Sequence, residues 1–210
     1  TATFTGQLRV LVDVYNCASN NLCATLTITC ATPPATVTNN ECAGAILLTV
    51  SDACNMQSFT NAGATRSTVT PYPTCANSTT AANFHDVWFR FVAPANGVVI
   101  IDSAPGTMTD GDMQLVHGTC GSFTNVLCSV NDGVGNMPRI DTRCAPLTAG
   151  DTYYIRYWGR SGNTGSFGLC VRGFSSFPTP QEDCAGGNTV CSSAPITNEA
   201  DYVGCVNDLN

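Results

Sequence analysis

Thirteen cysteines carry the most evident chemistry of this 210-residue chain. Structural zinc sites usually begin with C-x2–4-C pairs. The closest pairs here have five, six or seven residues between them: Cys17 and Cys23, Cys23 and Cys30, Cys184 and Cys191, and Cys120 and Cys128. Disulfides are therefore the better interpretation, and they place the protein in an oxidising compartment, outside the cell or at its surface.

A repeated motif suggests how the cysteines pair. An acidic residue followed by Cys-Ala-Gly occurs at Cys42 and again at Cys184, 142 residues later, a plausible period for one domain and its linker. Connectivity does not follow strictly from sequence. If each repeat is bridged alike, we expect Cys42–Cys170, Cys54–Cys75, Cys120–Cys128, Cys17–Cys23 and Cys191–Cys205, with Cys30–Cys184 formed between subunits and Cys144 left as a buried free thiol.

Two acidic loops offer oxygen ligands. Asp110-Gly-Asp112 and Asn131-Asp132-Gly could meet at one end of a sandwich and bind calcium, which takes six to eight oxygen ligands. The same sequences are also ordinary turns, in which Asp and Asn bond to their own backbone. Calcium is the one cofactor that these residues suggest.

Aromatic residues gather at 153–158, where Tyr157 and Trp158 are candidates for stacking on sugar rings. The alternative is that this run packs in the core and at an edge. His85 and Asp86 are adjacent on an expected strand, so they point to opposite faces and make a poor catalytic pair. No nucleophile elbow, zinc-protease helix, phosphate loop or dinucleotide motif occurs. We therefore expect that the protein is not an enzyme.

The charge and hydropathy exclude two kinds of partner. The net charge is −7, and all eight basic residues are arginine. Nucleic acid recognition needs a basic surface to replace condensed counterions. No apolar run approaches the ~20 residues of a membrane span. We expect neither nucleic acid binding nor membrane insertion.

Strands, rather than helices, are expected to position these side chains. Short segments rich in β-branched and aromatic residues are bounded by Gly, Pro, Asn and Asp, and turn signals recur at intervals typical of a β-sandwich. Residues 153–158 alternate as a strand with one solvated face does, whereas 88–92 read as an interior strand. The fold class is all-β, a disulfide-stapled sandwich of jelly-roll type, with strands expected at 4–14, 23–30, 86–94, 97–104, 113–118, 151–159 and 165–173.

Two Pro-containing linkers divide the chain. The expected parts are the closing strands of a part-domain (1–30), a linker (31–40), a complete domain (41–173), a second linker (174–182) and the opening strands of another part-domain (183–210). Isolated strands leave open edges that invite pairing with another chain. The ends therefore belong either to a longer multidomain protein or to subunits that complete one another head to tail in a filament.

Several segments carry a resemblance to a known family: NNECAGAILLTV (39–50), SFTNAGAT (58–65), residues 86–128 and residues 147–171. They are similar to the tandem β-sandwich repeats of secreted and cell-surface proteins of gliding, type IX-secreting bacteria, akin to pre-peptidase C-terminal domains. The resemblance covers residues 39–173 and implies a jelly-roll-like module in adhesins, surface appendages and secreted enzymes. It implies no active site. Residues 182–196 resemble the opening of a second repeat.

Two short motifs suggest attached sugar. Asn77-Ser-Thr is an N-x-[ST] sequon. Ser103, in Asp102-Ser-Ala, is similar to the O-glycosylation signal of the same bacterial group.

Two functions remain in view from the sequence. The first is an extracellular structural or adhesive module that polymerises with copies of itself, or repeats beside adjacent domains, to build a surface filament or adhesin stalk. The alternative is a glycan-binding accessory module of a secreted multidomain protein.

Overall fold

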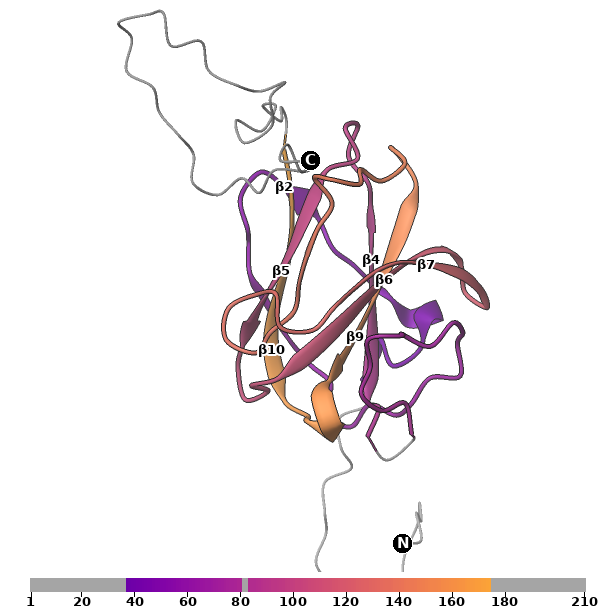
Figure 1. Ribbon diagram of the computed structural model, residues 1–210, viewed down its shortest axis with the longest axis vertical. Helices are drawn as coiled ribbons and strands as arrows, with labels where there is room; N and C mark the ends of the chain where they lie inside the picture. The colour runs from indigo at the N-terminus through magenta and orange to yellow at the C-terminus, as the bar shows by residue number, and fades with distance from the viewer. Residues whose placement is uncertain (1–36, 81–82, 175–210) are drawn as a thin grey trace, which may run out of the picture. The chain divides into compact units, whose positions relative to one another are not determined.

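The computed structural model describes residues 37–80 and 83–174, which form a β-sandwich (Figure 1). In chain order the elements are the 3₁₀ helix η1 (Cys42–Gly44), β1 (Ile46–Leu47), β2 (Val50–Ser51), β3 (Gln57–Thr60), β4 (Asp86–Val92), β5 (Val99–Pro105), β6 (Gly111–Thr119), β7 (Ser122–Ser129), β8 (Arg139–Asp141), β9 (Thr152–Gly159), the 3₁₀ helix η2 (Arg160–Gly162) and β10 (Ser166–Gly173). The described residues contain no helix long and apolar enough to cross a membrane.

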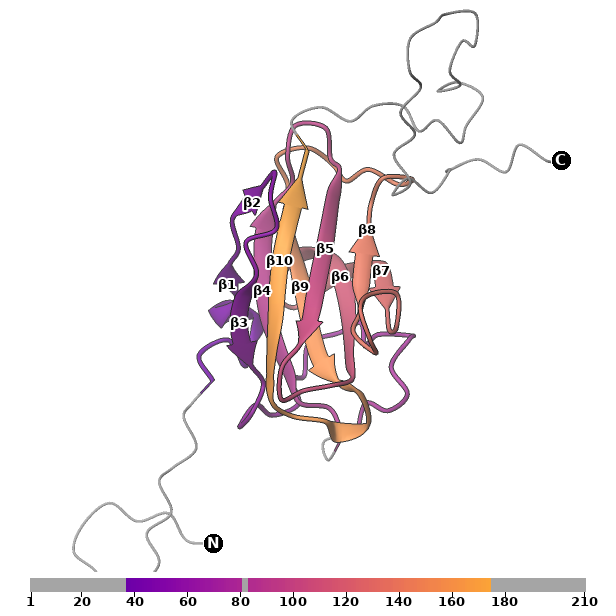
Figure 2. The same ribbon diagram turned by 90° about the vertical axis from the view of Figure 1, so that its left-hand side faces the viewer.

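The strands form two five-stranded sheets, which face each other (Figure 2). The first sheet has the order β1-β4-β9-β6-β7. The second has β2-β10-β5-β8, with β3 also paired to β10. The short strands β1 and β2 run parallel to β4 and β10 respectively, so residues 46–51 cross from one sheet to the other and close one edge of the sandwich. The all-β, jelly-roll-like sandwich expected from the sequence is confirmed.

Apolar residues at alternate positions of the long strands form the core, because successive side chains of a strand point to opposite faces. From β4, β9 and β6 the core receives Val87, Phe89, Phe91, Ile155, Tyr157, Met113 and Leu115, and from β5 and β10 it receives Val99, Ile101, Phe167, Leu169 and Val171. The rings of Tyr157 and Phe167 stack across it with centroids 4.1 Å apart.

Residues 61–80 and 83–85, here called the covering segment, lie over part of the outer face of the first sheet. Its Ser67 bonds to Asp86 of β4 and Arg156 of β9, and both of these charged side chains are fully buried. The prediction that 153–158 has one solvated face is therefore wrong, since every residue there except Tyr154 is buried. The prediction for 88–92 is also wrong, because Arg90 and Val92 are exposed.

Disulfides join Cys42 to Cys120, Cys54 to Cys170 and Cys75 to Cys128. None of these is an expected pair, so the predictions Cys42–Cys170, Cys54–Cys75 and Cys120–Cys128 are wrong.

The strand β7 explains one error, because the segment 120–128 was read as a compact loop. Cys120 lies in the turn before β7 and Cys128 lies near the end of that strand, and the six steps from Ser122 to Cys128 alone span roughly 20 Å at ~3.3 Å per residue. A bridge needs Cα atoms about 4.4–6.8 Å apart.

The other two errors come from the layers of the sandwich. Cys170 alternates with the core residues of β10 and so faces outward from the second sheet, where Cys54 meets it. Cys42 packs with Trp88 and Phe123 on the outer face of the first sheet. Two residues on outer faces of opposite sheets cannot bond through the core.

Cys144 is disulfide-bonded, which corrects its interpretation as a free thiol. The expected pairs Cys17–Cys23, Cys191–Cys205 and Cys30–Cys184 lie outside the described residues, as do both part-domains. The intersubunit pair was inferred from a Cys42–Cys170 template, which is not the pairing found.

Candidate functional site

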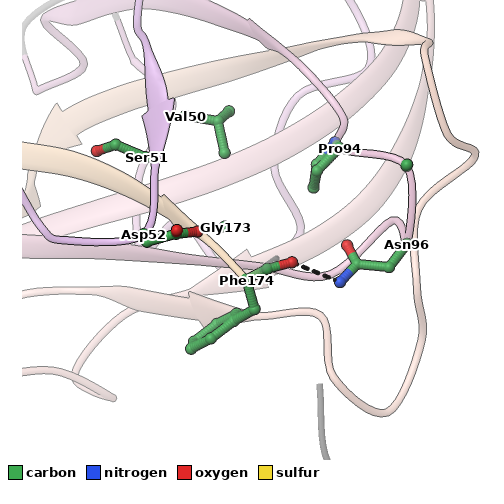
Figure 3. A pocket seen from close by; sticks show the side chains of 8 residues that line it. Val50, Ser51, Asp52, Pro94, Asn96, Gly173 and Phe174 are labelled. Carbon is green, nitrogen blue, oxygen red and sulfur yellow. Dashed lines mark hydrogen bonds between the residues drawn. The ribbon is translucent and has the colours of Figure 1, made fainter. Parts of the chain in front are cut away.

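A groove of about 540 Å³ lies where β2 and β10 end and where β4 turns into β5 (Figure 3). Three short stretches of chain line it. Its described lining consists of Val50, Ser51, Asp52, Pro94, Ala95, Asn96, Gly173 and Phe174.

Local sequence brings these stretches together. A Cβ atom on Gly173 would lie 2.7 Å from Cγ1 of Val50, so only glycine allows β2 to approach the end of β10 this closely. The Cys54–Cys170 disulfide ties the chain just after β2 to the same strand. On the opposite side, the turn Pro94–Gly97 is closed by a 2.8 Å bond from the Gly97 N–H to the Pro94 carbonyl, with Gly97 at a φ of +70°.

The groove combines an aromatic ring with polar groups. Phe174 is half-buried, and Figure 3 shows its ring pointing away from Asn96. The amide of Asn96 is held at both ends: Nδ2 donates to the Phe174 carbonyl at 2.8 Å, and Oδ1 accepts from the Val98 N–H at 3.1 Å. This leaves one amide hydrogen and one oxygen lone pair of Asn96 for a ligand. Ser51 donates to the Ala53 carbonyl at 2.7 Å.

Asp52 supplies the charge of the groove. Its side chain is exposed, and it is the one charged residue in the described lining. Arg172 lies nearby, with its guanidinium 5.8 Å from the centre of the Phe174 ring. Nε of Arg172 is paired with Asp102 at 3.3 Å, however, and Arg172 is not part of the lining.

A smaller groove of about 250 Å³ lies between β1 and β3. It is lined by Val37, Thr38, Asn39, Ile46, Phe59, Thr60 and Ala62, none of which carries a charge. The Phe59 ring packs edge-on against Phe89 of the core, 4.7 Å away, and Asn39 is bonded to the backbone of Trp88. Because its ring and amide are already used by the fold, the larger groove is the better candidate site.

The aromatic residues singled out from the sequence cannot bind sugar in this fold. Tyr157 and Trp158 are both fully buried. Tyr157 faces the core, and Trp158 lies beneath the covering segment with its ring 5.0 Å from that of Phe84. The prediction of ligand-stacking aromatics at these positions is wrong because both faces of β9 are covered there.

The acidic loops do not gather into a calcium site. Within the described residues, the one group of three candidate ligand atoms within 4.8 Å of one another is Cys54, Asp102 and Cys170, two of which form a disulfide. Asp112 is paired with Arg160 at 3.1 Å, Asp132 accepts from Ser129 Oγ at 2.6 Å, and Asn131 is exposed. Calcium binding by Asp110, Asp112, Asn131 and Asp132 stays a prediction without geometric support.

Burial changes the acidity of the groups around Asp112. Desolvation raises the pKa of Asp112 to about 6, and Asp110 adds to this rise while Arg160 opposes it. Desolvation likewise raises the pKa of the Tyr157 hydroxyl. Asp112 is therefore a carboxylate whose protonation follows pH in the mildly acidic range.

The two candidate glycosylation residues differ in access. Asn77 is exposed in the covering segment, where its Nδ2 donates to Ser161 Oγ at 2.7 Å. Ser103 is buried, and its hydroxyl donates to the Pro138 carbonyl. The prediction of O-glycosylation at Ser103 is wrong for the folded domain, because the modified oxygen would face β8 rather than solvent.

Sequence reasoning missed every residue of the larger groove. Phe174 was assigned to the second linker, 174–182. A glycine followed by an aromatic residue at the end of a strand was the available signal. It did not show that β2, which lies more than a hundred residues earlier, would form the other wall.

The structure is a two-sheet β-sandwich with a groove formed by loops and strand ends, a place where ligand sites commonly occur. Residues 38–171 match a family described as galactose binding domain-like and associated with type IX secretion. Because this match covers more than half of the chain, the chain belongs to that family. The resemblance to β-sandwich domains of type IX-secreting bacteria is confirmed, and it supports a secreted or surface protein.

Other comparisons add little. One solved structure that matches is the crystal structure of Aeromonas hydrophila PliG, a periplasmic lysozyme inhibitor of g-type lysozyme. It shares 11% sequence identity, covers 60% of this chain and 95% of that chain, and has a TM-score of 0.34, a level that carries no argument here. No curated protein matches the chain.

Proposed function

We propose that the chain is a glycan-binding accessory module of a secreted or surface multidomain protein, and that the groove at Phe174 is its binding site. The observation that carries the proposal is the meeting of an aromatic ring, an exposed carboxylate and a positioned amide in one groove, at Phe174, Asp52 and Asn96.

These groups match the chemistry of a sugar. One face of a pyranose ring presents C–H groups that pack on an aromatic ring, and its hydroxyls both donate and accept hydrogen bonds. Asp52 accepts, whereas the Asn96 amide can do both. The family description, galactose binding domain-like, supports the same class of ligand.

We also propose that the module does no catalysis. In the described lining of the groove, Asp52 is the one side chain with a carboxyl group. General acid–base chemistry on a glycan commonly uses a pair of carboxyl groups. An accessory domain needs only to hold its ligand near an enzyme or a surface.

Assembly into a filament stays a prediction of the sequence. It depends on the two part-domains and on Cys30 and Cys184, all of which lie outside the described residues. Multidomain attachment and head-to-tail assembly are both compatible with a glycan-binding groove, so the two functions are separable by experiment.

The proposal is tested by a glycan array of the full chain followed by calorimetry on each hit. We expect Phe174→Ala to weaken binding about three- to tenfold, because stacking of this kind contributes roughly 0.5–1.5 kcal/mol. Asn96→Ala should also weaken binding.

Tyr154→Ala is the matched control, since Tyr154 is a half-buried aromatic residue on the outer face of the first sheet. Unfolding curves of each variant separate loss of fold from loss of binding. Wild-type affinity in a folded Phe174→Ala protein would contradict the assignment of the site.

A further inference from the structure

The charge of the groove selects its ligand. We propose that the groove prefers neutral and amino-sugar glycans over acidic ones, and that Asp52 sets this preference. The inference rests on the proposed function, because it assumes that glycans bind in this groove.

The first step is the charge of the lining itself. Of the eight residues described there, seven carry no charge, and the eighth is Asp52. No hydrogen bond or ion pair of the Asp52 carboxylate occurs in the part of the chain that the structure describes. It therefore presents its full negative charge to whatever enters the groove.

The second step is that the neighbouring cation is already engaged. The Arg172 guanidinium lies over the Phe174 ring, 5.8 Å from its centre, and its Nε pairs with the Asp102 carboxylate at 3.3 Å. Nε of Arg139 lies at the same distance from the other oxygen of Asp102. No described arginine lines the groove, so no cation is placed there to receive a uronate, a sialate or a sulfate.

The consequence follows from Coulomb's law at a partly solvated surface. A carboxylate brought next to Asp52 is repelled and an ammonium group in the same place is attracted, whereas a hydroxyl or N-acetyl group carries no net charge and can still donate a hydrogen bond to Asp52. The net charge of −7 on the whole chain also repels acidic ligands, but it does so at any point of the surface and not only in the groove.

The experiment compares ligand pairs in which a charged group of the sugar is replaced by its neutral derivative. Calorimetry on the full chain measures a galacturonate oligosaccharide against its methyl ester, and a glucosamine oligosaccharide against its N-acetyl form. In each pair we expect the less acidic or more basic ligand to bind about two- to fivefold tighter, the range typical of exposed charge pairs. Asp52→Asn should bring both ratios close to one, whatever it does to the affinity for each neutral ligand.

Glu41→Gln is the matched control, because Glu41 is an exposed acid just before η1, outside the groove, and its loss changes the net charge by the same unit. If Asp52→Asn and Glu41→Gln changed the affinity ratios equally, the net charge alone would determine which glycans bind, and the inference would be overturned. Equal binding of acid and ester by the wild type would also overturn it while leaving the proposed function intact. No binding of any glycan would overturn both.

Discussion

Two buried carboxylates of the first sheet show how the surroundings of a single residue decide its chemistry. Asp86 is fully buried. Its carboxylate forms an ion pair with Arg156, whose Nε lies 2.8 Å away, and accepts a hydrogen bond from the backbone N–H of Ser67. Asp112 is also buried, but its partner Arg160 is partly exposed, at 29% of its side chain. The pKa of Asp112 is therefore raised by desolvation that its partner offsets only in part.

Asp112→Asn is expected to remove a pH dependence of stability. Since the pKa of Asp112 is about 6 in the folded domain, against 3.8 for an ordinary aspartate, the folded state holds this proton more tightly than the unfolded chain. The contribution of Asp112 to the free energy of unfolding is fully present below about pH 4 and is lost as pH rises through 6, by up to about 3 kcal/mol.

Urea unfolding of the oxidised protein between about pH 4 and 7 measures this slope. Glu41, whose pKa is raised by desolvation and by Asp86, contributes in the same direction, so the difference between wild type and variant isolates Asp112. Asp52→Asn, at an exposed carboxylate, should keep the wild-type slope. An unchanged slope in Asp112→Asn would contradict the assignment.

At the scale of elements, the covering segment converts one outer sheet face into a second, polar and aromatic core. The guanidinium of Arg156 lies 4.8–5.1 Å from the ring centres of Trp88, Tyr72 and Phe84. Tyr72 and Phe84 come from the covering segment and Trp88 from β4. The Cys75–Cys128 disulfide fastens the same segment to β7. The described part of the covering segment contains no strand and is thus tied to the first sheet by the bonds of Ser67 to Asp86 and Arg156, by the rings of Tyr72 and Phe84, and by one disulfide.

Asp86→Ala is expected to cost about 3–5 kcal/mol of stability, because it leaves Arg156 as an uncompensated buried charge. The double variant Asp86→Ala with Arg156→Met should be clearly more stable than the single variant, since it removes both charges. Denaturant unfolding of the two proteins beside the wild type checks this. A double variant less stable than Asp86→Ala would show that the packing of these two side chains, and not the pairing of their charges, stabilises the covering segment.

For the whole molecule, the three disulfides whose two ends both lie in the described residues act on different layers. The Cys42–Cys120 and Cys75–Cys128 disulfides attach neighbouring segments to the outer face of the first sheet. The Cys54–Cys170 disulfide attaches the segment after β2 to the outer face of the second sheet. They span 78, 53 and 116 residues along the chain. The chain-entropy model assigns about 4–5 kcal/mol to each loop of this length, without additivity.

Non-reducing peptide mapping of the full chain is expected to recover these three pairs. Removal of Cys75–Cys128 by a paired Ser substitution should lower the melting temperature, because the unfolded chain gains freedom. The same digest reports on assembly: a Cys30–Cys184 peptide found only in a disulfide-linked ladder on a non-reducing gel would support the filament. Recovery of Cys42–Cys170 or Cys120–Cys128 would contradict the described fold.

Alternation and turn signals were enough to predict the class of fold and the main long strands. They placed β4, β5, β6, β9 and β10 within a few residues, because each of these strands carries its own period-two pattern. They missed β3, β8 and β7, most of which falls in the segment 120–128 expected to be closed by a disulfide, and the two-residue strands β1 and β2. Such short strands exist only through their partners β4 and β10.

The amino-acid sequence by itself determined the oxidised, all-β character of this protein and its family, because composition, alternation and short motifs are local properties. Only the tertiary structure decided which cysteines bond, which aromatic residues are hidden, and where a ligand has room to bind. Each of these depends on pairs far apart in the chain: Cys54 meets Cys170, and Val50 meets Gly173. Disulfide pairing and groove shape depend on distances between residues in space. The spacing of two residues in the sequence fixes such a distance only when both lie in the same strand.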